Sequence, residues 1–153
     1  MPTVVDLAVV PGQALGPIVL GMSESDVIEG LGQPRARRQA DNGEGISMWW
    51  ASPWLRVDLD AEGLVEFCEV TFDDGEPHVS LDGVDLLALP ADEVAAHLSA
   101  SLGGDFEESG HSFMCPSGLT LWRVTLPEDG DANPNDRGGR YWRTVAVAAP
   151  GYW

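Results

Sequence analysis

The chain contains no lysine, and its eight basic residues are all arginine, against 25 acidic residues. The 153-residue chain therefore carries a formal net charge of −17 at pH 7. Nucleic-acid binding and docking on an anionic membrane both need clustered positive charge, so this composition argues against both. A strongly acidic surface keeps a protein soluble, or it attracts a basic protein partner.

Cysteines and long hydrophobic runs are also scarce. The first residues have neither the positive region nor the apolar stretch that a signal peptide or membrane span needs. Two cysteines, Cys68 and Cys115, imply no disulfide framework, and both are expected to stay reduced in a cytoplasm. We therefore expect a cytoplasmic protein, long enough to bury a real core in a single domain.

Motifs for catalysis or metal binding are missing as well. Glu93 and His97 have the spacing of a solvated helix pair more than of a catalytic base. His111 and Cys115 lack the further ligands of a zinc site. Asp73, Asp74 and Glu76 lack calcium-loop spacing. We expect a chain that is not an enzyme and has no cofactor and no metal. The alternative is a small intracellular enzyme or ligand-binding domain with a site between two repeats.

The clearest local pattern is a short helix with its start and stop signals. Ser23 is a good N-cap, and Asp26 follows three residues later, as in a capping box. Gly32 can take the left-handed conformation that ends a helix, and Pro34 prevents its continuation. The pattern predicts a helix over residues 24–31.

The same pattern returns, weakened, in the second half of the chain. One constant offset pairs Gly16 with Gly83 and Val27 with Val94. Pro90 takes the first helical position, which needs no backbone N–H, so a second helix is expected over about 90–102.

Alternating apolar and polar residues predict strands after each helix. Strands are expected at 46–50, 54–59 and 64–72, then at 110–115, 119–123 and 141–149, with loops at 35–45 and 128–139. The expected fold class is α+β: two tandem helix-plus-antiparallel-meander repeats that form one sheet with helices on one face. The repeats cover about 14–75 and 80–149 of a single domain, 1–153.

The first helix also carries a resemblance to known families. Leu20-Gly-Met-Ser-Glu-Ser-Asp-Val27, followed by Leu31-Gly-Gln-Pro34, is similar to the helix opening of BamE-type (SmpA/OmlA) domains. The tandem arrangement resembles the architecture of β-lactamase-inhibitor proteins, which doubles that unit. The chain also resembles small actinobacterial proteins of immunity-type or uncharacterised function. These resemblances imply a concave sheet face that grips an enzyme with aromatic and acidic residues.

Tryptophan is abundant, with six residues in the chain. Trp49 and Trp50 are adjacent on a strand, so their side chains must point to opposite faces. Aromatic cross-strand packing would explain the tryptophans, but Trp, Tyr and Arg are also the residues enriched in interface hot spots. The candidate protein-binding residues are Trp49, Trp50, Trp54, Trp122, Trp142 and Tyr141.

These observations together favour a non-enzymatic protein-binding module, inhibitor-like or immunity-like, with an open aromatic and acidic sheet face. The expected partner is a basic protein, such as an enzyme or a toxin, and not a nucleic acid or a membrane.

Overall fold

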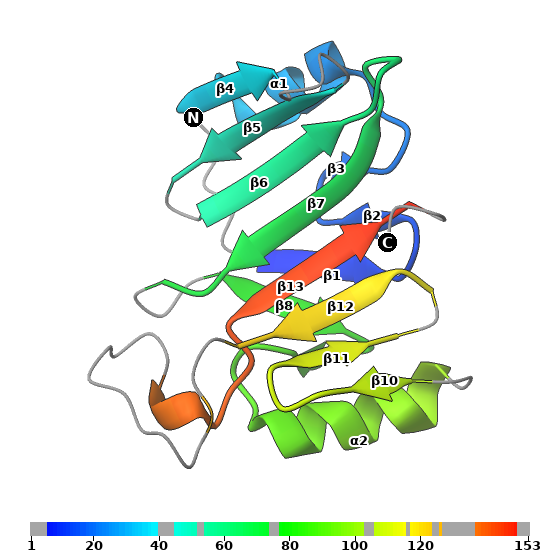
Figure 1. Cartoon of the computed structure of the whole chain (residues 1–153), viewed down its shortest axis with the longest axis vertical. Helices are drawn as coiled ribbons and strands as arrows, with labels where there is room; N and C mark the ends of the chain where they lie inside the picture. The colour runs from blue at the N-terminus through cyan, green and yellow to red at the C-terminus, as the bar shows by residue number, and fades with distance from the viewer. Residues whose placement is uncertain are drawn as a thin grey trace.

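The computed structural model describes residues 6–39, 45–51, 54–73, 77–102, 106–115, 117–123, 126 and 137–149. Within these ranges the protein has two layers (Figure 1). An eight-stranded sheet forms one layer. A five-stranded sheet lies behind its middle, and the two helices lie at opposite ends of the molecule.

The eight-stranded sheet is antiparallel throughout, with the order β10-β11-β12-β13-β7-β6-β5-β4. Its strands are β4 (Ala36–Gln39), β5 (Ile46–Trp50), β6 (Trp54–Leu59), β7 (Val65–Thr71), β10 (Glu107–Glu108), β11 (Ser112–Met114), β12 (Leu119–Trp122) and β13 (Thr144–Ala148). Two four-stranded meanders, β4 to β7 and β10 to β13, join where β7 pairs with β13.

The five-stranded sheet connects the two halves of the chain a second time. Its order is β3-β2-β1-β8-β9, and β1 pairs with β8 in parallel. Its strands are β1 (Asp6–Val10), β2 (Ala14–Leu15), β3 (Ile18–Val19), β8 (His78–Leu81) and β9 (Val84–Asp85). In β1 the burial alternates, with Leu7 and Val9 buried, as expected of a strand with one face on the core.

Helix α1 (Glu24–Leu31) has the bounds and the cap that the sequence predicts. The Ser23 hydroxyl accepts a hydrogen bond from the Asp26 N–H at 3.2 Å, and Gly32 follows with φ 83°. Helix α2 (Ala91–Leu102) begins after Pro90, and a 3-10 turn, η1 (Arg137–Gly139), precedes the last strand. No helix in the described ranges combines the length and hydropathy needed to cross a bilayer.

One continuous hydrophobic core lies between the layers. It combines side chains from both sheets and both helices, among them Leu7, Val27, Val57, Val94 and Leu121. The large sheet contributes every second residue of its strands to this core, because only one face of each strand points inward. The opposite face, which we call the outer face, is turned away from the five-stranded sheet and carries the candidate site.

The predicted α+β class is wrong, because the protein is mostly β and its strands form two sheets instead of one. Within the eight-stranded sheet, each helix is followed by four strands and not by three. The additional strand β4 lies in the segment 35–45, which the sequence indicates as a loop. Its four side chains are all exposed, so it forms by backbone pairing at a sheet edge and has no apolar face to reveal it.

The second sheet was missed for a related reason. Strands β2, β3 and β9 have two residues each, too few to establish a period of two. Strand β8 pairs with β1, a segment of the other half of the chain, so no local pattern announces it. The strand β10 at the other edge of the large sheet consists of two glutamates, which are poor strand formers on their own.

Candidate functional site

The six candidate side chains lie in three different places. Trp49, Trp54 and Trp122 lie on the outer face of the eight-stranded sheet. The register fixes this, because Trp54 lies opposite Thr71 and Trp122 lies opposite Thr144, in one row across the sheet. Trp54 is 46% exposed, the most accessible of the described tryptophans, whereas Trp49 and Trp122 are partly buried.

Trp50 and Trp142 belong to the core. Trp50 points to the opposite face from Trp49, as strand alternation requires, and its indole N–H donates to the Gly32 carbonyl at 3.1 Å. This bond ties β5 to the end of α1. Trp142 is 1% exposed, with its ring centroid 6.4 Å from that of Phe113. Neither side chain can meet a partner without unfolding.

Tyr141 lies apart from the tryptophans of the outer face. Its ring contacts the guanidinium of Arg137, in a second hollow discussed below. The six residues therefore do not form one site, and the outer face retains three of them.

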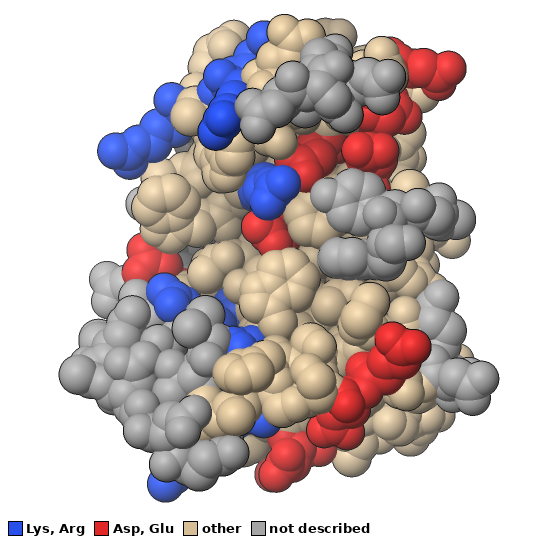
Figure 2. Space-filling view, in the orientation of Figure 1, with Lys and Arg blue, Asp and Glu red and all other residues tan. Residues whose placement is uncertain are grey.

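A shallow hollow lies between two of the outer-face tryptophans. Its volume is about 410 Å³, and we call it the tryptophan hollow; its walls are Trp49, Trp54, Leu55, Arg56, Glu69, Thr71 and Arg143. Figure 2 views the molecule from this side. The neighbouring part of the outer face is closed, because Phe67, Ala146 and Ala148 are buried there with Trp122 packed against them.

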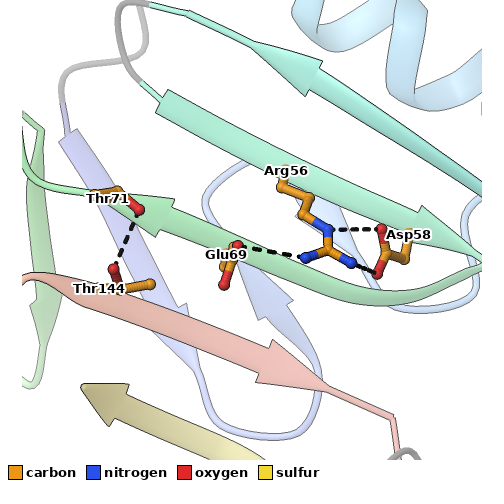
Figure 3. Close-up of polar contacts among 5 residues, drawn as sticks. All are labelled: Arg56, Asp58, Glu69, Thr71 and Thr144. Carbon is orange, nitrogen blue, oxygen red and sulfur yellow. Dashed lines mark hydrogen bonds and ion pairs between the residues drawn. The ribbon is translucent and has the colours of Figure 1, made fainter. Parts of the chain in front are cut away.

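Arg56 organises the floor of the tryptophan hollow (Figure 3). Its guanidinium donates to both carboxylate oxygens of Asp58, at 3.0 and 2.8 Å, and lies 3.8 Å from Glu69. The guanidinium carbon also lies 6.0 Å from the Trp49 ring centroid and 5.5 Å from that of Phe67. On the next strands the hydroxyls of Thr71 and Thr144 are 3.1 Å apart. The contacts of this planar cation with two carboxylates and two rings hold the side chains of the hollow in place.

The charges of the outer face are largely compensated. Asp58 is only 6% exposed and forms an ion pair with Arg56. Burial raises the pKa of Glu69, and the neighbouring Arg56 partly offsets that increase. The acid expected beside a tryptophan is Asp73, which accepts a hydrogen bond from the Trp54 indole at 3.1 Å.

The two edges of the large sheet carry opposite charges. Arg37 and Arg38 lie on β4, and Glu107 and Glu108 form β10 at the other edge. Figure 2 shows basic atoms over the β4 edge and acidic atoms over the β10 edge. The negative net charge of the chain is thus a property of the whole molecule and not of the tryptophan hollow.

The other candidate chemistry remains dispersed. His111 Nδ1 lies 3.2 Å from the Arg123 carbonyl, while Cys115 is buried and burial raises the pKa of its thiol to about 12. Such a thiol supplies almost no thiolate, the form that attacks an electrophile. Within the described ranges no group of three or more His, Cys, Asp and Glu side chains is placed to hold a metal ion.

The tryptophans of the hollow are predictable from the sequence, whereas its polar residues were not among the predicted site residues. Arg56, Asp58, Glu69 and Thr71 are alternate residues of β6 and β7, so they share a face with Trp54. The signal was present, because Leu55 and Val57 mark the inward positions and their neighbours must point outward. The pairing of β7 with β13, which brings Thr144 beside Thr71, could not be read from local pattern.

The chain matches no family model, and comparisons with curated proteins and with solved structures likewise gave no match.

Proposed function

We propose that the chain is a non-enzymatic protein-binding module that contacts a basic protein partner through the tryptophan hollow. The observation that carries this proposal is Trp54, a large indole left 46% exposed at the rim of a hollow of about 410 Å³. An accessible indole beside a second tryptophan and an arginine is typical of an interface hot spot. The proposed location is the cytoplasm, where thiols such as Cys68 and Cys115 stay reduced.

The composition of the hollow supports a protein as the occupant. Tryptophan and arginine are the residue types most enriched in interface hot spots, and here Trp49, Trp54 and Arg56 lie together. Indole and guanidinium planes offer stacking surfaces for an aromatic side chain or a peptide plane. A shallow hollow on a sheet can receive a side chain that projects from the surface of a partner protein.

The charge of the molecule supports a basic partner. A net charge of −17 attracts a basic protein over long range, although the ion pairs around Arg56 make the contact surface itself nearly balanced. Charge would therefore accelerate encounter, and the aromatic hollow would determine how long the complex lasts. An inhibitor or immunity protein of net acidic charge would be drawn to a basic enzyme or toxin in this way.

Capture from native cell extract tests the proposal with a matched pair of variants. Trp54→Ala removes the rim indole, and Val19→Ala changes a side chain of equal exposure, 46%, on the other sheet. We expect wild type and Val19→Ala to retain the same basic protein and Trp54→Ala to lose it, with binding weakened by roughly 2 kcal/mol or more.

Salt provides the second arm of that experiment. Added salt should slow association and change dissociation less, because steering is screened beyond about 10 Å at 0.1 M. Equal retention by Trp54→Ala, or retention only of acidic proteins, would rule out this proposal.

A further inference from the structure

A second hollow lies away from the outer face, where the two halves of the chain meet. Its volume is about 440 Å³, and it lies at the end of β7, the start of β8 and the turn η1. Figure 1 shows these three elements on one side of the molecule. Phe72, Pro77, Leu87 and Tyr141 make most of its wall apolar, and Arg137 is its cation. We call it the Arg137 hollow.

Arg137 is held in a fixed position at this hollow. Its Nη1 donates to the Leu87 carbonyl and its Nη2 donates to the Trp142 carbonyl at 2.9 Å. The guanidinium carbon lies 3.8 Å from the Phe72 ring centroid and 4.4 Å from that of Tyr141. The cation therefore lies against two aromatic rings, which together with the two carbonyls restrict its position.

The backbone of Arg137 is itself unusual. Its φ of 50° lies in the left-handed region, which costs a residue with a Cβ about 1 kcal/mol or more. Residues held in such conformations concentrate at binding and catalytic sites, where the surrounding structure enforces them. The carbonyls of Leu87 and Trp142 hold the side chain of this same residue.

The positive charge of Arg137 lacks a carboxylate partner in the described part of the chain. The acid on the described part of the wall, Asp85, has other partners: one oxygen accepts the Leu87 and Ala88 N–H groups, and the other lies 2.7 Å from His78 Nδ1. Among the described residues, the buried Nε of Arg137 also has no hydrogen-bond partner. Arg137 is half-buried, and a cation with no carboxylate beside it among the described residues can receive an anionic group.

We propose that the Arg137 hollow binds a small organic oxyanion with an apolar body. The carboxylate or phosphate head is held by N–H groups of Arg137 that the two carbonyls leave unused, since a guanidinium has five. The apolar body lies against Phe72, Leu87 and Tyr141. A volume of about 440 Å³, with apolar walls and few polar groups, is typical of small-molecule sites. This site is separate from the tryptophan hollow and independent of the proposed protein partner.

Titration of the full chain with four probes tests the proposal. Benzoate and phenyl phosphate present the two oxyanion heads on an aromatic body, benzamide is the uncharged counterpart, and inorganic phosphate lacks the body. We expect amide resonances of Leu87 and Ala88 to shift with benzoate, phenyl phosphate or both, at least about tenfold more tightly than with benzamide or inorganic phosphate. The difference between the first two probes identifies the preferred head.

Two variants test whether the charge of Arg137 is needed for binding. Arg137→Gln removes the charge and should abolish the shifts, whereas Arg35→Gln removes an exposed arginine elsewhere and should leave them unchanged. If Arg137→Gln fails to fold, the titration of the wild-type chain still decides. Absence of shifts with both aromatic anions, equal binding of benzamide, or shifts confined to the Trp49 and Trp54 indoles would overturn the proposal.

Discussion

Arg56 shows how one residue type determines the surface around it. Its planar fork meets both oxygens of Asp58, lies near Glu69 and lies over the rings of Trp49 and Phe67. A lysine offers a point charge on a flexible stem and cannot make this set of contacts at once. The chain contains no lysine, and at position 56 the contacts require arginine.

Replacement of Arg56 by lysine should destabilise the protein. The Asp58 and Glu69 side chains are only 9% and 17% exposed, so loss of the guanidinium leaves Asp58 without two hydrogen bonds and weakens the ion pair with Glu69. We expect a loss of about 1–2 kcal/mol in the free energy of unfolding from urea melts. The control Arg35→Lys, at an exposed position, should change stability by no more than about 0.5 kcal/mol. Equal effects of the two substitutions would show that the fork does not matter.

The two cysteines give the stability a defined dependence on pH. Burial raises the pKa of Cys68 and of Cys115 to about 12 from the ordinary 9.0. Above about pH 9 the unfolded thiols lose protons that the native thiols keep, so the stability from these groups decreases as pH rises towards 12. Urea melts across this window should show a steeper decrease for wild type than for Cys68→Ala. Parallel slopes would mean that Cys68 ionises equally in both states.

At the scale of elements, the sequence predicts what is local and periodic. Helix α1 begins after Ser23 and ends at Leu31 as its cap and its glycine indicate, and β5 and β6 have their expected bounds. Strands at the edges and between distant segments were not predictable, as β4 and β8 demonstrate. Their pairing depends on backbone groups that all residues share, so it cannot be predicted from the pattern of side chains.

In the candidate site too, local features were predictable and long-range ones were not. Parity on β5 places Trp49 and Trp50 on opposite faces, and this part could be predicted from the sequence. Which of them faces outward depends on the position of the second sheet, which the sequence did not reveal. The Arg137 hollow was out of reach, since it needs η1, β8 and the end of β7 together.

The turn before β12 should be sensitive to a single added carbon. Gly118 has φ 80°, and a Cβ there would lie 2.4 Å from the Ala148 carbonyl oxygen. Gly63 has nearly the same φ, 81°, but no atom within 4 Å of its Cβ position. Gly63→Ala should therefore cost about 1 kcal/mol for backbone strain alone, and Gly118→Ala at least about 1 kcal/mol more. Urea melts measure both, and equal losses would contradict the close approach of the turn to β13.

At the scale of the whole molecule, the two halves of the chain are joined twice. Strand β7 pairs with β13 in the large sheet, and β1 pairs with β8 in the small one. The hydrophobic core draws side chains from both halves without interruption. Unfolding of either half alone would expose the apolar surface of the other half to water.

The protein should therefore unfold in one cooperative transition, as the expected single domain requires. Tryptophan fluorescence includes the core positions Trp50 and Trp142, one in each half, which lose their buried surroundings on unfolding, while far-UV circular dichroism reports on both sheets. The urea midpoints from the two signals should coincide. Two separated transitions would mean that the halves are independent domains.

The central claim is that the tryptophan hollow is the face that meets a partner. Fluorine NMR of the chain labelled with 5-fluorotryptophan tests it most directly, because single Trp→Phe variants assign each signal. On addition of the captured basic protein, we expect the signals of Trp54 and Trp49 to shift or broaden while those of Trp50 and Trp142 remain in place. A complex that forms with the Trp54 and Trp49 signals unchanged would contradict the claim.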